Sequence, residues 1–216
     1  MEIVIAGGHG KIALLTERLL ADAGHTVRAL IRNSAHEADV EATGATPVVA
    51  DLEELDSEQL ATLLTGAAAV VYAAGAGPGS GPARKWTMDY GGAVKLIEAC
   101  TRAGVDRYVM VSGRGADADA PDDGSFGTYL KAKGQADAEL QASKLRYTII
   151  RPVGLTDDPA SDAVSTDPDS GVETIPRADV AAAIVAVLGE PRTAGRTVVL
   201  RSGSETVAAA IESLLQ

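Results

Sequence analysis

Short apolar runs alternate with helix-like segments along almost the whole chain, and this alternation constrains the fold more than any other feature. The apolar runs are continuous, which is typical of strands buried on both faces of a parallel sheet. The expected strands are 2–6, 27–31, 46–50, 68–74, 107–112, 146–151 and 196–200. The expected helices are 11–23, 56–64, 84–103, 126–143, 177–188 and 204–215. Helical crossovers between such strands predict an α/β fold with helices on both faces of the sheet.

Length and composition favour one folded unit. The chain has 216 residues, of which 46% are hydrophobic, so it can bury a sizeable core. Because the sequence shows no internal repeat and no linker, we expect residues 1–216 to form a single domain. Two polar segments, at about 113–128 and 154–175, are expected to be loops that cover a substrate.

Charge and residue content argue against several classes of function. The 19 basic and 30 acidic residues give a net charge of −11, which disfavours binding to nucleic acid or to an anionic membrane surface. Cys100 is the single cysteine and the three histidines lie far apart in the sequence, so we expect no metal site. No apolar stretch reaches the roughly 18 residues of a membrane span. The expected location is the cytoplasm, and both a monomer and a homodimer stay open.

A glycine-rich turn joins the first expected strand to the first expected helix. Gly7, Gly10 and Ala13 have the spacing G-x-x-G-x-x-A. Glycine lets the backbone approach a pyrophosphate, and the helix N-terminus presents N–H groups to that anion. A P-loop is excluded because Ile5 and Ile12 stand where it requires Gly and then Ser or Thr. The residues of this turn expected to hold a dinucleotide are Gly7, His9, Gly10, Lys11 and Ile12. The alternative is that the turn is purely structural.

The end of the second expected strand favours NADP(H) over NAD(H). An acidic residue at this point would bind a ribose 2′-hydroxyl, but Arg32 stands here, followed by Asn33. A guanidinium can pair with the 2′-phosphate of NADP(H), and a solvated surface arginine is the alternative. After the third expected strand, Asp51 and Leu52 lie where an adenine could be held, although Asp51 could equally be an ordinary loop or cap residue.

Tyr129 and Lys133 lie four residues apart and therefore on one face of an expected helix. The pKa of a free tyrosine is about 10, and an adjacent ammonium would lower it, so Tyr129 is expected to donate or accept a proton near neutral pH. Ser112 ends the fifth expected strand, at the sheet edge where ligands bind, and is expected to hydrogen-bond a substrate oxygen. An exposed helix face and a strand-terminating turn are the structural alternatives.

These segments together resemble the short-chain dehydrogenase/reductase superfamily, in particular its atypical NAD(P)-binding branch near the extended epimerase/dehydratase type and the NmrA-like proteins. The resemblance is carried by residues 5–13, 27–32, 129–134, 145–152 and 177–181. It implies a Rossmann fold, which is a doubly wound parallel sheet in a three-layer α/β/α arrangement. The implied strand order is 3-2-1-4-5-6 with an added seventh strand.

The resemblance also implies roles for site residues. Tyr129 would be the catalytic acid/base, Lys133 its modulator and a ligand of the nicotinamide ribose, and Ser112 the substrate anchor. Asp89 takes the catalytic position where the superfamily usually has Asn. Further residues along the cofactor would be Ala73, Ala74, Gly75, Pro152 and Val153. The implied function is an NADP(H)-dependent oxidoreductase or epimerase for a small carbonyl, quinone or flavin-like substrate, and the alternative is a non-catalytic NADP-binding sensor.

Overall fold

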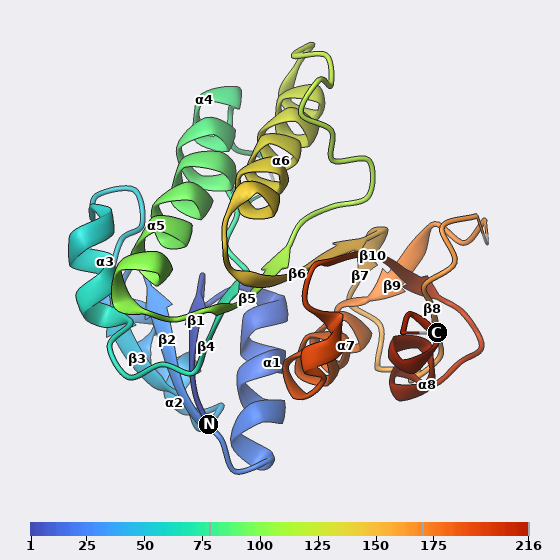
Figure 1. Cartoon of the computed structure of the whole chain (residues 1–216), viewed down its shortest axis with the longest axis horizontal. Helices are drawn as coiled ribbons and strands as arrows, with labels where there is room; N and C mark the ends of the chain where they lie inside the picture. Colours follow the sequence, from blue (N-terminus) through green and yellow to red (C-terminus); the bar gives the residue numbers. More distant parts are fainter. Residues whose placement is uncertain (78, 170, 216) are drawn as a thin grey trace.

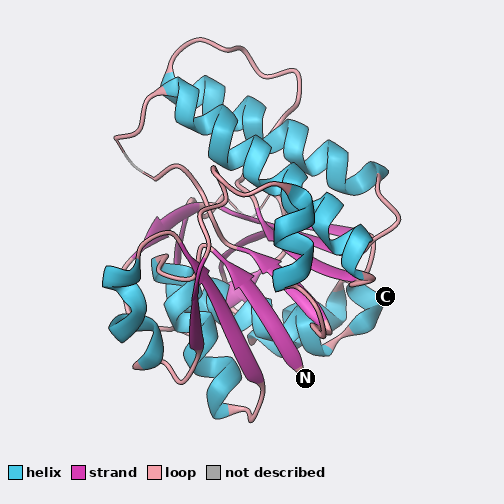
Figure 2. Ribbon diagram, turned by 90° about the vertical axis from the view of Figure 1, so that its left-hand side faces the viewer, coloured by secondary structure: helices cyan, strands magenta, loops and turns pink. Residues whose placement is uncertain are grey.

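The computed structural model describes residues 1–77, 79–169 and 171–215. An eight-stranded sheet crosses the middle of the described chain, and helices cover both of its faces (Figure 1, Figure 2). The strand order is β3-β2-β1-β4-β5-β6-β10-β8. The bounds are β1 (Glu2–Ala6), β2 (Thr26–Ile31), β3 (Thr46–Val49), β4 (Ala69–Tyr72), β5 (Arg107–Val111), β6 (Arg146–Pro152), β8 (Val164–Ser165) and β10 (Arg196–Ser202). Neighbours from β3 to β10 are parallel and β8 adds an antiparallel edge, so the predicted Rossmann fold and its strand order are confirmed.

Two helical layers enclose the sheet (Figure 1). One layer contains α1 (Lys11–Asp22), α7 (Arg177–Gly189) and α8 (Val207–Ser213), and the other contains α3 (Ser57–Leu63), α5 (Ala93–Ala103) and α6 (Ser125–Ala142). Successive side chains of a strand point to opposite faces. In β1, Ile3 and Ile5 join the core beneath α1 and α7, whereas Val4 and Ala6 join the core beneath α3 and α5. All four side chains are fully buried, which explains why the strand sequence has no polar face.

Two short helices lie between β2 and β3, where the apolar pattern indicated none. They are the 3-10 helix η1 (Ser34–His36) and α2 (Glu37–Glu41). Asn33 caps η1, because its Oδ1 accepts a hydrogen bond from the N–H of Ala35 at 2.9 Å. Val40 is buried while its neighbours in α2 are exposed or half-buried. A helix this short and polar gives no periodic signal in a sequence.

The helix expected at 84–103 is divided into three consecutive segments. They are α4 (Pro82–Arg84), the π-helix η2 (Lys85–Gly92) and α5. The hydroxyl of Tyr72, from β4, donates to the backbone carbonyl of Met88 inside η2. A side chain that binds a helical carbonyl disturbs the regular helical hydrogen bonds, and this accounts for the change of helix type. Such π-helical turns are frequent at functional sites, and η2 carries Asp89.

The segment 154–175, expected to be a covering loop, contains short strands. Its elements are β7 (Gly154–Thr156), β8 and β9, which runs on to Pro176 (Thr174–Pro176). β7 pairs with β9 in parallel and β8 pairs with β10. Strands of two or three residues are shorter than any periodic pattern, so composition indicated a loop. Ser170 of this segment and Gln216 of the predicted domain lie outside the described residues. A 3-10 helix, η3 (Pro191–Thr193), completes the elements.

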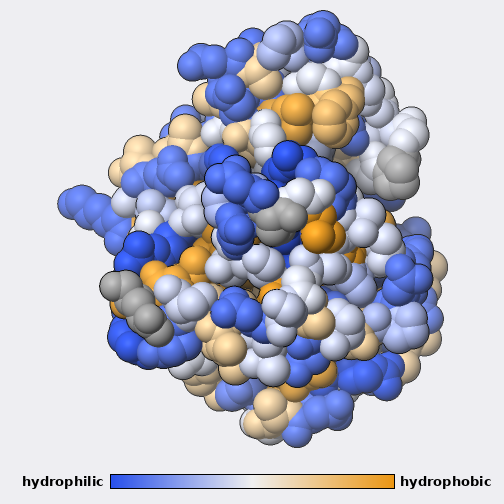
Figure 3. Space-filling model, turned by 90° about the vertical axis from the view of Figure 1, so that its right-hand side faces the viewer, coloured by the Kyte–Doolittle hydropathy of each residue, from blue (hydrophilic) through white to orange (hydrophobic). Residues whose placement is uncertain are grey.

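Hydrophilic side chains cover most of the face shown in Figure 3, with small hydrophobic groups between them. Phe126, at the start of α6, is 72% exposed, which is high for a large aromatic side chain. In the ranges that the structure describes, no helix combines the length and the apolar character needed to cross a membrane.

Candidate functional site

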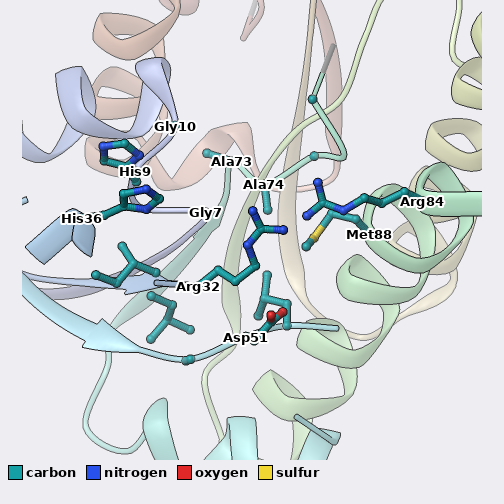
Figure 4. Close-up of a pocket in the computed structure, with 16 residues that line it drawn as sticks. Gly7, His9, Gly10, Arg32, His36, Asp51, Ala73, Ala74, Arg84 and Met88 are labelled. Atoms are coloured by element: carbon teal, nitrogen blue, oxygen red, sulfur yellow. The ribbon is translucent and has the colours of Figure 1, made fainter. Parts of the chain in front are cut away.

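A pocket of about 360 Å³ opens at the carboxyl ends of β1, β2, β3 and β4 (Figure 4). The strand order reverses between β1 and β4, and doubly wound sheets bind ligands at this point. Several residues predicted to hold a dinucleotide line the pocket, namely Gly7, His9, Gly10, Arg32, Asp51, Leu52, Ala73, Ala74 and Gly75. The structure adds Leu30, Ile31, His36, Ala50, Gly77, Arg84 and Met88 to this lining.

The glycine turn between β1 and α1 borders the pocket. Gly7 has a φ of +81°, and a Cβ at this position would lie 2.6 Å from the Cα of Ala74. A Cβ at Gly10 would lie 3.1 Å from the carbonyl oxygen of Gly7. Glycine therefore lets this turn pack tightly against the end of β4. Among the described residues, no side chain caps the N-terminus of α1 and its first turn carries no acidic residue, so its N–H groups fit a pyrophosphate.

Two arginines reach into the pocket from opposite sides (Figure 4). Arg84 donates from Nε and Nη2 to Oε2 of Glu53, each at 3.0 Å, and from Nη1 to the carbonyl of Ala76 at 3.1 Å. Burial raises the pKa of Glu53, but hydrogen bonds from Thr87 and Arg84 and the charges of Arg84 and Arg32 together lower it below its ordinary value. Since Glu53 neutralises Arg84, the exposed Arg32 supplies positive charge to the pocket at the end of β2.

Two histidine rings stack at the Arg32 side of the pocket. The ring centroids of His9 and His36 are 3.6 Å apart, and the ring planes differ by 9°. His9 Nε2 lies 2.8 Å from Oδ2 of Asp39. His36 belongs to η1, which the sequence did not predict, and the contact joins residues that are far apart in the chain. Spacing could not indicate it, because only the tertiary fold brings the two rings together.

Six residues predicted to contact the cofactor do not line this pocket; Lys133, Pro152 and Val153 are described below, and the other three are Lys11, Ile12 and Asn33. Lys11 Nζ lies 2.5 Å from Oδ2 of Asp157 and borders a separate hollow. Ile12 is packed into the core beneath α1. Asn33 is engaged in capping η1. Lys11 was expected at the dinucleotide site, but its ammonium is directed to the carboxylate of Asp157.

A second pocket, of about 490 Å³, lies beyond β5 and β6 on the same edge of the sheet. Tyr129, Pro152 and Val153, which the sequence singled out, line it. The structure adds Gly113, Arg114, Phe126, Gly154, Leu155, Glu173 and Arg177. A Cβ on Gly113 would lie 2.7 Å from Oη of Tyr129, so glycine at this position leaves room for the hydroxyl. The phenolic group is thus placed at a hollow that can admit a small molecule.

The pKa of Tyr129 is raised to about 12, and not lowered as expected. Burial disfavours the phenolate, and the carboxylates of Asp89 and Asp137 repel it. Nζ of Lys85 lies 5.6 Å from the centroid of its ring. Lys133 is engaged elsewhere, because its Nζ donates to the carbonyl of Val111 at 3.1 Å and lies over the ring of Tyr72 at 5.4 Å.

Lys133 forms a buried ion pair with Asp89. Their Nζ and Oδ1 atoms are 3.4 Å apart, and their side chains are only 4% and 2% exposed. Asp89 also accepts a hydrogen bond from the N–H of Ala76 at 3.1 Å. The pair therefore fixes α6 against η2 and the loop after β4, close to the first pocket. The carboxylate that replaces the usual asparagine neutralises the charge that was expected to act on Tyr129.

Ser112 is held by an aspartate that the sequence reading missed. Its hydroxyl donates to Oδ2 of Asp137 at 2.9 Å, and the same oxygen accepts from Nε of Arg151 at 2.8 Å. Burial raises the pKa of Asp137 despite the charge of Arg151 and these hydrogen bonds. Ser112 was expected to donate to a substrate oxygen, but its proton is already used, so its oxygen can only accept. A helical spacing of four residues from Lys133 was the signal that could have revealed Asp137.

Within the described ranges, no group of three or more His, Cys, Asp or Glu side chains is arranged to hold a metal ion. The groups described above are a glycine turn, an exposed arginine, a protonated tyrosine and two buried carboxylates. Such a set can bind a phosphorylated dinucleotide and transfer a proton.

Comparison with known proteins supports a dinucleotide-binding site. A family model described as NAD(P)H-binding matches residues 7–191. The chain is 36% identical over 215 residues to a Bacillus subtilis protein named as an uncharacterized sugar epimerase, YhfK, covering 99% of this chain and 100% of that one. A Bacillus halodurans structure described as a putative NAD-dependent epimerase/dehydratase superposes with a TM-score of 0.90 at 33% identity, covering 99% of each chain. The crystal structure of the Lactococcus lactis oxidoreductase ylbE superposes with a TM-score of 0.86 at 27% identity, covering 100% of this chain and 97% of that one. The chain therefore belongs to the NAD(P)H-binding family of atypical short-chain dehydrogenase/reductase-like proteins.

Proposed function

We propose that this chain is an NADP(H)-dependent reductase in which Tyr129 protonates the oxygen of a small carbonyl or quinone substrate. The observation that carries the proposal is the placement of two groups along one edge of the sheet. Arg32 lines the pocket at the end of β2, and Tyr129 lines the pocket beyond β5 and β6. A dinucleotide that lies across the strand ends of such a sheet would span both positions.

The first pocket fits the phosphorylated form of the cofactor. The glycine turn and the N-terminus of α1 would hold the pyrophosphate, and Arg32 would pair with the 2′-phosphate. Asp51 and Leu52 line the pocket where an adenine would lie. When bound, NADPH supplies a hydride, and the protein provides orientation and the proton.

Tyr129 is suited to giving a proton rather than taking one. With a pKa of about 12, its hydroxyl remains protonated near neutral pH. Addition of hydride to a carbonyl leaves an alkoxide, which is a stronger base than a phenolate, so transfer from Tyr129 Oη is favourable. An epimerase would instead need a base that removes a substrate proton. The raised pKa therefore favours reduction over epimerisation.

A non-catalytic NADP-binding sensor is the second candidate. It is favoured by two contacts that remove the usual partners of the tyrosine. Lys133 is neutralised by Asp89, and Ser112 donates to Asp137. A protein that binds NADPH with this arrangement and turns nothing over would match that description.

The test compares the wild type with Tyr129→Phe in NADPH oxidation, using a panel of aromatic aldehydes and p-quinones. Tyr147→Phe is the matched control, because Tyr147 lies on β6 and packs against the core away from both pockets. Calorimetric titration with NADPH establishes that each variant still binds the cofactor. The reductase predicts turnover that Tyr129→Phe abolishes and Tyr147→Phe retains. Cofactor binding without turnover that depends on Tyr129 would favour the sensor.

A further inference from the structure

Cationic side chains gather at the Tyr129 pocket of a strongly acidic protein. Among the described residues that line this pocket, Arg114 and Arg177 are cationic and Glu173 is anionic, so its lining carries a positive balance. The whole chain has a net charge of −11. A positively charged pocket on a negatively charged protein attracts anionic ligands to that pocket.

The backbone that carries Arg114 is fixed to the sheet. The N–H of Ser112 donates to the carbonyl of Ile150 at 2.8 Å, and the N–H of Arg114 donates to that of Pro152 at 2.9 Å. The pairing of β5 with β6 therefore continues to the rim of the pocket. The backbone of Arg114 is therefore already held in place at this rim.

The guanidinium of Arg114 is bound by an exchangeable carboxylate. It pairs with Glu173, and the two side chains are 47% and 57% exposed. Exposed ion pairs of this kind contribute little to stability. Glu173 thus shows the position that a carboxylate occupies on Arg114, and an external carboxylate can replace it at low cost.

Arg177 retains positive charge although it has an acidic partner. Its Nη1 lies 2.6 Å from Oδ1 of Asp157, but Oδ2 of the same aspartate is bound by Lys11 at 2.5 Å. One carboxylate is therefore shared between two cations. The excess positive charge lies beside the Tyr129 pocket, which Arg177 also lines.

The remaining walls suit a flat apolar body. The rings of Phe126 and Tyr129 stack with centroids 6.1 Å apart and planes 25° apart. Pro152, Val153 and Leu155 add apolar surface. A planar conjugated group would contact these walls while its charged end reached the arginines.

We propose that the Tyr129 pocket takes a carbonyl substrate that carries a carboxylate, held by Arg114 with Arg177 beside it, and that Glu173 occupies the place of this carboxylate in the free protein. This inference rests on the proposed reductase function, which supplies the reacting carbonyl. The two halves of the ion pair then have opposite effects. Loss of Arg114 removes the binding group, whereas loss of Glu173 removes a competitor. An ion pair that served only to hold the loops together would give effects of the same sign.

The test uses a pair of aldehydes that differ in charge, 4-carboxybenzaldehyde and its methyl ester. The measured quantity is kcat/KM for the acid divided by kcat/KM for the ester, because this ratio cancels general damage to the enzyme. Arg114→Gln should lower the ratio by about tenfold or more, the strength of a charge-assisted hydrogen bond. Glu173→Gln should raise it by about two- to fivefold, the strength of an exposed ion pair. Arg192→Gln and Glu190→Gln break an ion pair between an exposed arginine and a half-buried glutamate outside the pocket, and serve as controls.

A calorimetric titration of the NADP⁺-loaded protein with 4-carboxybenzaldehyde separates this inference from the proposed reaction. Binding that weakens in Arg114→Gln and strengthens in Glu173→Gln supports the inference even where no aldehyde is reduced, in which case only the reductase proposal fails. Reduction of acid and ester with the same ratio in all variants overturns the inference and leaves the reductase intact. Binding of the acid that neither variant changes also overturns it.

Discussion

The ammonium of Lys133 lies 3.4 Å from the carboxylate of Asp89, and both side chains are almost completely buried. Asp89 comes from η2, beside the dinucleotide pocket, and Lys133 comes from α6, which also carries Tyr129. The pair ties these two helices together and neutralises the lysine. Together with burial and the charge of Asp137, the carboxylate of Asp89 keeps the pKa of Tyr129 near 12.

Asp89→Asn should lower the pKa of Tyr129 below about 12. The substitution removes a carboxylate that repels the phenolate and leaves the charge of Lys133 uncompensated. The measurement is ¹³C NMR of labelled tyrosine between neutral pH and the alkaline limit of stability, with the Tyr129 signal assigned by Tyr129→Phe. The variant signal should begin to shift at a lower pH than in the wild type. Asp106→Asn, at an exposed position before β5, should leave the titration unchanged. An identical titration in Asp89→Asn would contradict the assigned role.

Gly113→Ala should reduce turnover while NADPH binding is retained. The added Cβ would meet Oη of Tyr129 at 2.7 Å, so the hydroxyl must move away from its present position. A misplacement of a reacting group by about 1 Å lowers the rate by on the order of 10- to 100-fold. Gly189→Ala is the control, because a Cβ at that position meets no atom within 4 Å among the described residues. The measurements are kcat and the calorimetric Kd for NADPH. Wild-type turnover in Gly113→Ala would show that the hydroxyl does not act from this place.

Glu17→Gln should remove a pH dependence of stability. Glu17 is fully buried on α1, and burial raises its pKa to about 7 despite a hydrogen bond from Thr43. The unfolded chain ionises this group near 4.5, so its full contribution to stability is present below that pH and is lost as the pH rises through about 7. The loss is roughly 3 kcal/mol, at about 1.4 kcal/mol for each pH unit between the two pKa values.

Urea unfolding of the wild type and Glu17→Gln at intervals from pH 5 to about pH 8 tests this. The difference in unfolding free energy between the two proteins should change in favour of the variant as the pH rises. A difference that stays constant over this range would show that Glu17 does not titrate in the folded protein.

The sheet and its strand order could be predicted because their signals are local. Continuous apolar runs such as that of Ile3 to Ala6 arise from burial on both faces, and the glycine turn arises from its contact with Ala74. The interruption of the helix expected at 84–103 depends on a tertiary contact instead. The π-helix η2 reflects the hydrogen bond from the hydroxyl of Tyr72 to the carbonyl of Met88. The two residues belong to different elements, so a local sequence pattern does not indicate this bond.

The site divides in the same way. The positions of Arg32 and Tyr129 at strand ends and on a helix face followed from the sequence pattern. The partners of the charged groups did not, because Lys133 meets Asp89 and Ser112 meets Asp137 across different elements. The sequence therefore located the titratable groups, whereas the sign of the pKa shift of Tyr129 depended on burial and on carboxylates from other parts of the chain.

The affinity of the chain for NADPH and NADH, with and without Arg32, tests the central claim most directly. Calorimetric titration of the wild type should give tighter binding of NADPH. Arg32→Glu should weaken NADPH by about 10- to 100-fold, the worth of a hydrogen-bonded charge pair, and weaken NADH much less. Arg196→Glu, at the start of β10 on the opposite edge of the sheet, is the control of equal charge change. Equal losses for both cofactors in Arg32→Glu, or no loss for either, would contradict the assignment of the 2′-phosphate to Arg32.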